Sequence, residues 1–296
     1  MRAIVCLFSV TLVAGTALSA AAVDAVRQTA RTIHVTVTDG KGMPVTDLTA
    51  ADITIREGGR DREVVAVEPA SARMQLSLLV EQRLVGDGSV RVGLFEFMKR
   101  VHDRADIALI TVGMRNETVV DYTNDMNRLV AALNGLTLNP APQSNLTEGV
   151  LELASTIEKT RPERPVIVVV ALSGGQSGGP SPNNVLTQLR QSGATMHAVT
   201  LAGGGETDAQ GPAGLADASG REQVLGDGSK QGGGRRHDVT TTNAIPKALQ
   251  QVANDLLAQY VIRYTLPEGT KPDRRLNVGT KRRGLTLRAP TAMPDR

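Results

Sequence analysis

The fold is set by residues 166–172, which read Val-Ile-Val-Val-Val-Ala-Leu without a polar side chain. A continuous apolar run of this length, rich in β-branched residues, is typical of a strand that is buried on both faces of a parallel sheet. Two more buried strands are predicted before it, at 76–80 and 107–112, and another strand after it, at 195–201. We therefore expect these segments to form the centre of one sheet.

Segments with helical spacing of apolar residues separate the predicted strands. They cover 90–101, 129–133, 146–157, 185–189 and 245–257, and a last strand follows at 260–264. Strands that alternate with helices predict a doubly wound, mainly parallel α/β sheet, here over residues 72–266. Ligands of such sheets bind at the carboxyl ends of the strands, so the loops at those ends are the candidate site.

Different patterns occur around and within this region. Residues 30–69 hold short alternating apolar runs separated by turns such as Asp39-Gly40-Lys41-Gly42, which predicts a small all-β module resembling a β-sandwich. Residues 203–238 are rich in Gly, Ala, Asp and Ser, and we expect a flexible insertion there. Residues 267–296 are predicted to form a basic C-terminal β-hairpin tail.

The first 22 residues predict export. A positively charged start, Met1-Arg2, is followed by an apolar core at 4–13 and small residues at 19–22, which is the order of a secretory signal peptide. We expect cleavage near residue 21 or 22, no membrane span in the mature chain, and a secreted, periplasmic or cell-envelope location. Cys6 is the only cysteine, so the mature chain would have no thiol and no disulfide.

The composition argues against a nucleic-acid partner and against a cofactor. The formal net charge is only +3 over 296 residues, and with 3 Phe, 3 Tyr and no Trp the aromatic platforms that stack on single strands are missing. No two of the 4 histidines have metal-ligand spacing. The glycine-rich stretches 226–230 and 232–234 lack the Gly-Lys-Ser/Thr ending of a phosphate-binding loop.

The order of these pieces resembles the bacterial von Willebrand factor A-related proteins. The likeness is carried by residues 37–45 (Val-Thr-Asp-Gly-Lys-Gly-Met-Pro-Val), by the segment 48–57, by the α/β series and by the ending 252–264. Members of this family that bind ligands through a metal do so at a metal-ion-dependent adhesion site. There an Asp-x-Ser-x-Ser loop, a Thr and a final Asp hold a divalent cation through oxygen ligands.

This chain departs from that ligand pattern. Glu81 stands in place of the first Asp, Arg83 and Val85 replace the two serines, and Gly174 replaces the final Asp. A fixed positive charge on Arg83 would lie where the cation belongs. We therefore predict a degenerate site without a metal, in an exported protein that binds a protein or cell-envelope ligand and catalyses nothing. Its binding residues would be Glu81, Arg83, Gly174, Gln176, and Ser144 and Thr147 at the family's Thr position.

Two local motifs allow other interpretations. Asp87-Gly88-Ser89 also reads Asp-x-Ser, but it directly precedes the predicted helix 90–101, so a capping role is expected. Residues 175–179 (Gly-Gln-Ser-Gly-Gly) match the Gly-x-Ser-x-Gly motif of serine hydrolases, with an Asp and then His237 following in triad order. The alternative function is therefore a secreted serine hydrolase that uses Ser177 and His237, although the next predicted helix begins too late for a nucleophile elbow.

Overall fold

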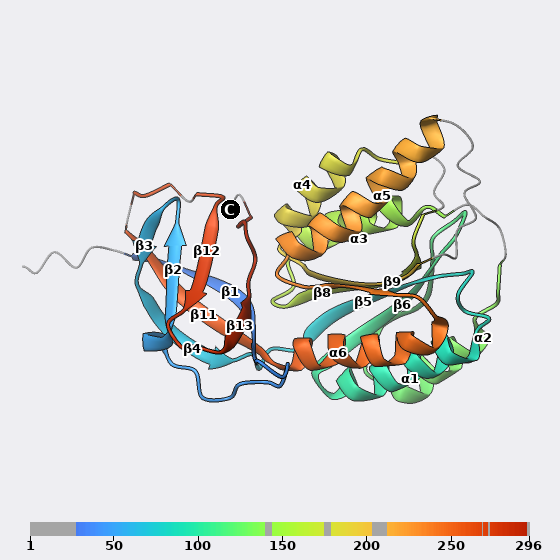
Figure 1. Cartoon of the computed structure of the whole chain (residues 1–296), viewed down its shortest axis with the longest axis horizontal. Helices are drawn as coiled ribbons and strands as arrows, with labels where there is room; N and C mark the ends of the chain where they lie inside the picture. Colours follow the sequence, from blue (N-terminus) through green and yellow to red (C-terminus); the bar gives the residue numbers. More distant parts are fainter. Residues whose placement is uncertain are drawn as a thin grey trace, which may run out of the picture.

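The computed structural model describes residues 28–139, 144–174, 179–202, 212–267, 269–271 and 273–294. Two domains lie side by side, an α/β domain around a six-stranded sheet and a β domain made of two smaller sheets (Figure 1). The mainly parallel α/β fold predicted from the sequence is confirmed. The predicted signal peptide, residues 1–22, lies outside the described residues.

The six-stranded sheet has the order β10-β9-β8-β5-β6-β7, and β7 runs antiparallel to β6 while the other neighbours are parallel. Every residue of β8 is buried, in agreement with the prediction for residues 166–172. A strand without polar side chains requires cover on both faces, which the centre of the sheet provides. The strands are β5 (Met74–Glu81), β6 (Ala105–Val112), β7 (Glu117–Thr123), β8 (Pro165–Leu172), β9 (Thr195–Leu201) and β10 (Arg236–Val239).

Helices cover both faces of this sheet (Figure 1). On one face lie α1 (Gly88–Val101), α2 (Met126–Gly135) and α6 (Ile245–Leu257). On the other lie α3 (Leu146–Thr160), α4 (Pro182–Ser192) and α5 (Pro212–Gln231). Short 3-10 helices occur at Ala50–Asp52, His102–Arg104 and Thr242–Ala244. Among the described helices, none is both long and apolar enough to cross a membrane.

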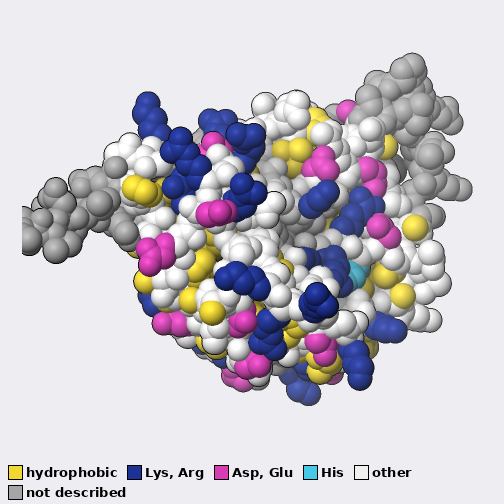
Figure 2. All heavy atoms as spheres, turned by 60° about the vertical axis from the view of Figure 1, so that its left-hand side comes forward, with side chains coloured by type: hydrophobic (Ala, Val, Ile, Leu, Met, Phe, Trp, Pro, Cys, Tyr) yellow, Lys and Arg dark blue, Asp and Glu magenta, His cyan; other side chains and the backbone are white. Residues whose placement is uncertain are grey.

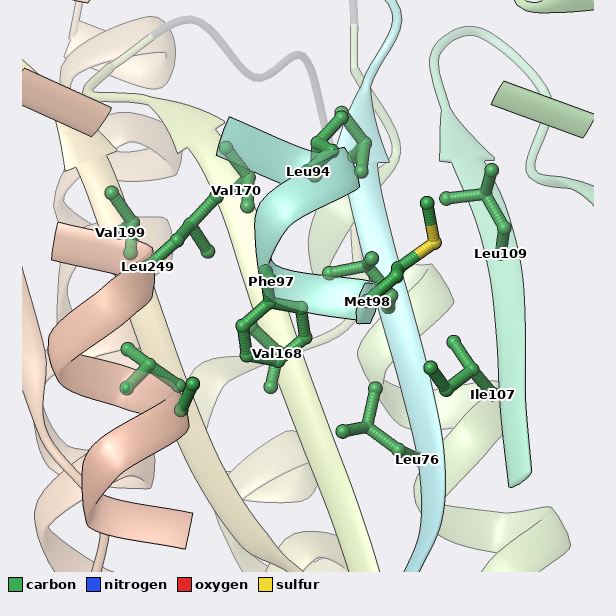
Figure 3. Packing of buried hydrophobic residues seen from close by; sticks show 14 of the residues in the cluster. Leu76, Leu94, Phe97, Met98, Ile107, Leu109, Val168, Val170, Val199 and Leu249 are labelled. Atoms are coloured by element: carbon green, nitrogen blue, oxygen red, sulfur yellow. The ribbon is translucent and has the colours of Figure 1, made fainter. Parts of the chain in front are cut away.

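The core under α1 shows how the helices are fixed to the sheet. Phe97 and Met98 of α1 point toward β8, β5 and β6, where they meet residues such as Val168 and Leu76 (Figure 3). All four side chains are at most 1% exposed. Burial of such side chains stabilises the domain by roughly 1.5–3 kcal/mol each.

The predicted helix cap at Asp87 is confirmed. Its Oδ1 accepts hydrogen bonds from the backbone N–H groups of Ser89 at 2.7 Å and Val90 at 3.2 Å. A cap of this kind satisfies N–H groups that have no partner inside the helix. Asp87 is therefore committed to the start of α1 and is not oriented as a replacement metal ligand.

The predicted flexible insertion at 203–238 is wrong over most of its described part, which forms α5 and the start of β10. Glycine in a helix costs about 1 kcal/mol relative to alanine, which is why the composition indicated a loop. Tertiary packing outweighs that cost. A Cβ at Gly228 would lie 2.8 Å from Met196 Cε and 2.9 Å from Leu189 Cδ1, so glycine allows α5 to pack closely on β9 and α4.

The β domain combines both ends of the described chain. A four-stranded sheet, β13-β1-β11-β4, and a three-stranded sheet, β12-β2-β3, share one apolar core. Ile33, Val35 and Tyr264 from the first sheet join Ile55 and Leu276 from the second. The strands are β1 (Gln28–Asp39), β2 (Ile53–Glu57), β3 (Arg60–Arg62), β4 (Val64–Pro69), β11 (Gln259–Pro267), β12 (Leu276–Thr280) and β13 (Leu285–Arg288).

Two features of this domain differ from the predictions. Strand β11, expected as the last strand of the α/β sheet, instead pairs antiparallel with β1 and β4. The expected C-terminal hairpin is also wrong, because β12 pairs with β2 and β13 pairs with β1. The apolar alternation of these strands shows that one face is buried, but it does not reveal which strand lies alongside.

Arg164 holds together the two connections between the domains. The chain passes from β4 to β5 near Ala72, and from α6 to β11 between Leu256 and Gln259. The guanidinium of Arg164 is buried and donates to Ala72 O at 3.1 Å, to Leu256 O at 2.6 Å and to Gln259 Oε1 at 2.9 Å. Burial, with a contribution from Arg104, lowers the pKa of Arg164 to about 10, so it stays charged at neutral pH.

Two histidines should make the protein sensitive to acid. Burial lowers the pKa of His34 to about 4 and the pKa of His197 to about 3. The positive charges of nearby arginines contribute to both shifts as a smaller cause. Between about pH 6.5 and pH 4 the unfolded chain therefore binds protons that the folded chain does not. The free energy of unfolding should fall as the pH falls through this window, by up to about 1.4 kcal/mol per pH unit for each histidine.

Urea denaturation of the wild type and of His197→Gln at pH 7, 6, 5 and 4 measures this slope. We expect the variant to lose less stability per pH unit than the wild type, whatever its stability at pH 7. Equal slopes would contradict the assignment of the acid sensitivity to His197.

Candidate functional site

The candidate site lies at the carboxyl-terminal edge of the parallel sheet. Strand β5 ends at Glu81, β8 at Leu172 and β9 at Leu201. The register places Val80 beside Val170 and Leu172 beside Leu201, so the three ends lie at one edge. The predicted loop residues are thereby brought to the edge where ligands of such sheets bind.

Glu81 is the centre of a buried ion-pair network. Its side chain is 1% exposed. Its Oε2 accepts hydrogen bonds from Arg221 Nη2 at 2.7 Å and from the Leu172 backbone N–H at 2.8 Å. Its Oε1 accepts one from Arg83 Nη2 at 3.2 Å. Both carboxylate oxygens are therefore engaged by donors from the protein itself.

Arg221 is the site residue that sequence reasoning missed. It belongs to α5, is fully buried, and donates to Leu172 O at 2.6 Å as well as to Glu81. From the sequence, Arg83 was expected in the position of the cation. In the structure Arg221 makes the shorter contact with Glu81, and Arg83 covers the other oxygen. Arg221 is spaced from Val224 and Leu225 by three and four residues, as on one face of a helix, and all three are buried. This spacing could have predicted a helix, but the many glycines around it indicated a loop instead.

The other predicted residues line neighbouring loops. Ser144 and Thr147 lie at the start of α3 and are buried, and Ser144 Oγ has no hydrogen-bond partner among the described residues. The Asn145 N–H donates to Gly113 O at 2.8 Å, which ties this start to the end of β6 beside β5. Gly174 has φ of 75°, a conformation that glycine adopts without strain. Gln176 lies outside the described residues.

The described donors at this edge do not fit a divalent cation. Mg²⁺ and Ca²⁺ require about six oxygen ligands. Among the predicted site residues the only carboxylate is Glu81, and its oxygens already bind two guanidinium groups and a backbone N–H. A guanidinium within hydrogen-bonding distance would also repel an incoming dication. In the described part of the chain, no group of three or more His, Cys, Asp or Glu could hold a metal ion.

The hydrolase alternative gains no support from the described residues. His237 lies in the middle of β10, beside Val199 and two residues before the strand ends. Burial and the charge of Arg235 lower its pKa, and its other charged neighbours include Asp255. Ser177 lies outside the described residues, and α4 begins only at Pro182, later than a nucleophile elbow requires.

The α/β domain has a von Willebrand factor A-like fold, which confirms that part of the sequence prediction. No family model and no curated protein matches the chain. Among solved structures it is similar to proximal thread matrix protein 1 from the mussel byssus, with a TM-score of 0.50 and 14% identity. The match covers 68% of this chain and 50% of that one, so the chain spans half the length of the mussel protein.

Two bacterial structures are similar over nearly their whole length. The vWF domain of the type V pili tip protein Mfa5 from Porphyromonas gingivalis has a TM-score of 0.44 and 13% identity, over 63% of this chain and 96% of that one. An aerotolerance-related membrane protein from Bacteroides fragilis has a TM-score of 0.43 and 14% identity, over 61% and 98%. At such identities the likeness concerns the fold and not the function.

Proposed function

We propose that this chain is an exported, non-enzymatic binding protein whose von Willebrand factor A-like domain contacts a protein partner without a metal ion. The observation that carries the proposal is the buried pair of Glu81 and Arg221 at the carboxyl edge of the sheet. A permanent guanidinium supplies there the positive charge that an adhesion site takes from a bound cation. Binding would then need no ion from solution.

Arg83 is the part of this site that a partner could reach. Its side chain is 16% exposed, whereas the side chains of Arg221 and Glu81 are 0% and 1% exposed. Two guanidinium groups, those of Arg83 and Arg221, lie against the single carboxylate of Glu81. Arg83 Nε is buried and has no hydrogen-bond partner among the described residues. These features favour a partner that presents an acidic group to the loop after β5.

Quantitative capture from a native envelope fraction tests the proposal. The full chain is immobilised and incubated with the fraction in the presence of Mg²⁺ or of EDTA. We expect the same captured protein at the same yield in both conditions. Arg83→Glu should reduce the yield about tenfold, because it replaces an attractive charge by a repulsive one. Lys159→Gln, an exposed change in the last turn of α3, is the matched control and should leave it unchanged.

Two outcomes would contradict the proposal. One is loss of capture in EDTA together with micromolar binding of Mg²⁺, Mn²⁺ or Ca²⁺ in calorimetry. The other is labelling of Ser177 by a fluorophosphonate probe in the folded protein, which would favour the hydrolase alternative.

A further inference from the structure

A cavity of about 480 Å³ lies between the two domains. Its walls come from the end of α5, the start of β10, and strands β12 and β13. Because β10 runs parallel to its neighbour β9, its start belongs to the edge of the sheet opposite the candidate site. The charged side chains that line the cavity are all basic: Lys230, Arg235, Arg236 and Arg288. Lys and Arg side chains are numerous on the face of the molecule that Figure 2 shows.

Arg236 is the only one of these cations that is fully compensated by carboxylates. Its Nη2 lies 2.5 Å from Glu222 Oε2 and 2.7 Å from Asp238 Oδ1. These two acids do not line the cavity. Arg236 therefore lines the cavity, but its charge is neutralised by Glu222 and Asp238.

Of the other three cations, two share one carboxylate. Arg288 Nη2 lies 2.5 Å from Asp255 Oδ1, and Arg235 Nε lies 3.9 Å from Asp255 Oδ2. Lys230 is exposed and has no ion-pair partner among the described residues. Three positive charges thus face a single negative charge. The cavity carries a clear surplus of positive charge even after its internal ion pairs are counted.

Arg288 also has donors that nothing satisfies. Its Nε and Nη1 are buried and have no hydrogen-bond acceptor in the part of the chain that the structure describes. Leaving a buried donor unpaired costs about 1–3 kcal/mol, and more for a charged group. Burial lowers the pKa of Arg288 despite the neighbouring Asp255, so this carboxylate only partly offsets the loss of water. Arg288 therefore adds an incompletely compensated positive charge to the lining of the cavity.

We propose that this interdomain cavity binds an oxyanion of the phosphate class, such as a phosphate ester. Guanidinium groups present paired N–H donors that match phosphate oxygens, and lysine adds a point charge. The volume admits a phosphoryl group with a small organic substituent. Arg288 belongs to the β domain, whereas Lys230 and Arg235 belong to the α/β domain, so the anion would bridge the two. The proposal is independent of the partner site at the opposite edge.

Calorimetry of the full chain with sodium pyrophosphate at fixed ionic strength tests the proposal. We expect saturable binding to one site that sodium chloride at equal ionic strength does not reproduce. A parallel sedimentation assay uses vesicles of phosphatidylcholine with or without phosphatidylglycerol. Binding to the anionic vesicles identifies a lipid headgroup as a source of the phosphate, and binding of pyrophosphate alone identifies a free phosphorylated molecule.

Variants then locate the site. Lys230→Gln and Arg235→Gln change side chains that are at least partly exposed, and each should weaken binding about tenfold, as expected for loss of one charge-assisted contact. Lys159→Gln is the control, because Lys159 lies in the last turn of α3 as Lys230 lies in the last turn of α5. The proposal is overturned if neither pyrophosphate nor anionic vesicles bind, or if Lys230→Gln and Lys159→Gln bind equally well.

Discussion

Replacement of Arg221 by methionine is expected to lower the free energy of unfolding by about 3–5 kcal/mol. Glu81 is 1% exposed, and Arg221 supplies the guanidinium that lies 2.7 Å from its Oε2. Without that group, the carboxylate keeps only the Leu172 N–H and the more distant Arg83 as partners. Guanidinium chloride denaturation at pH 7 measures the change.

The matched control is the double variant Glu81→Gln with Arg221→Met. It removes both charges together, and replacement of a whole buried ion pair by neutral groups of similar size is often close to neutral. We expect it to recover most of the stability that the single variant loses. A single variant that costs less than about 1 kcal/mol would show that the pair is not buried as described.

Replacement of Arg164 by methionine should have an effect of similar size, about 3–5 kcal/mol. The change removes hydrogen bonds from a charged donor to Ala72, Leu256 and Gln259, and such bonds contribute roughly 1.5–3 kcal/mol each without being additive. Because these acceptors lie on both interdomain connections, we also expect faster amide exchange there. Hydrogen exchange followed by mass spectrometry should show at least a tenfold increase at residues 70–74 and 256–260.

Arg161→Met provides the control for this experiment. Arg161 lies on the same loop between α3 and β8, but it is exposed and makes no side-chain hydrogen bond to either connection within the described part of the chain. It should leave both stability and exchange unchanged. Equal exchange in Arg164→Met and Arg161→Met would mean that the connections are held by packing alone.

The two edges of the sheet use arginine in different ways. At the carboxyl edge, Arg221 is buried against Glu81, and Arg83 pairs with the same carboxylate while it stays partly exposed. At the amino edge, Arg164 binds main-chain carbonyls and fixes the connections between the domains. In the cavity beside it, Arg288 retains donors without acceptors. The last two of these arginines lie where the domains meet.

The candidate site was only partly predictable. The sequence correctly placed Glu81 at the end of β5 and Gly174 after β8, because strand ends follow directly from where apolar runs stop. It also identified the cap at Asp87, whose signal is local. Arg221 could not be found in this way, since it is 140 positions away from Glu81 and lies in a stretch whose glycines suggested a loop. Whether the site binds a partner without a metal stays a prediction.

The sequence by itself determined the α/β class and the buried centre of the sheet, because burial on both faces leaves a local pattern of apolar residues. Only the tertiary structure decided that α5 is a helix, that β11 leaves the parallel sheet for the β domain, and that β12 and β13 join different sheets. These outcomes depend on contacts between segments far apart in the chain. A local pattern of apolar residues shows that one face of a strand is buried. Which strand pairs with it depends on the packing of the whole molecule.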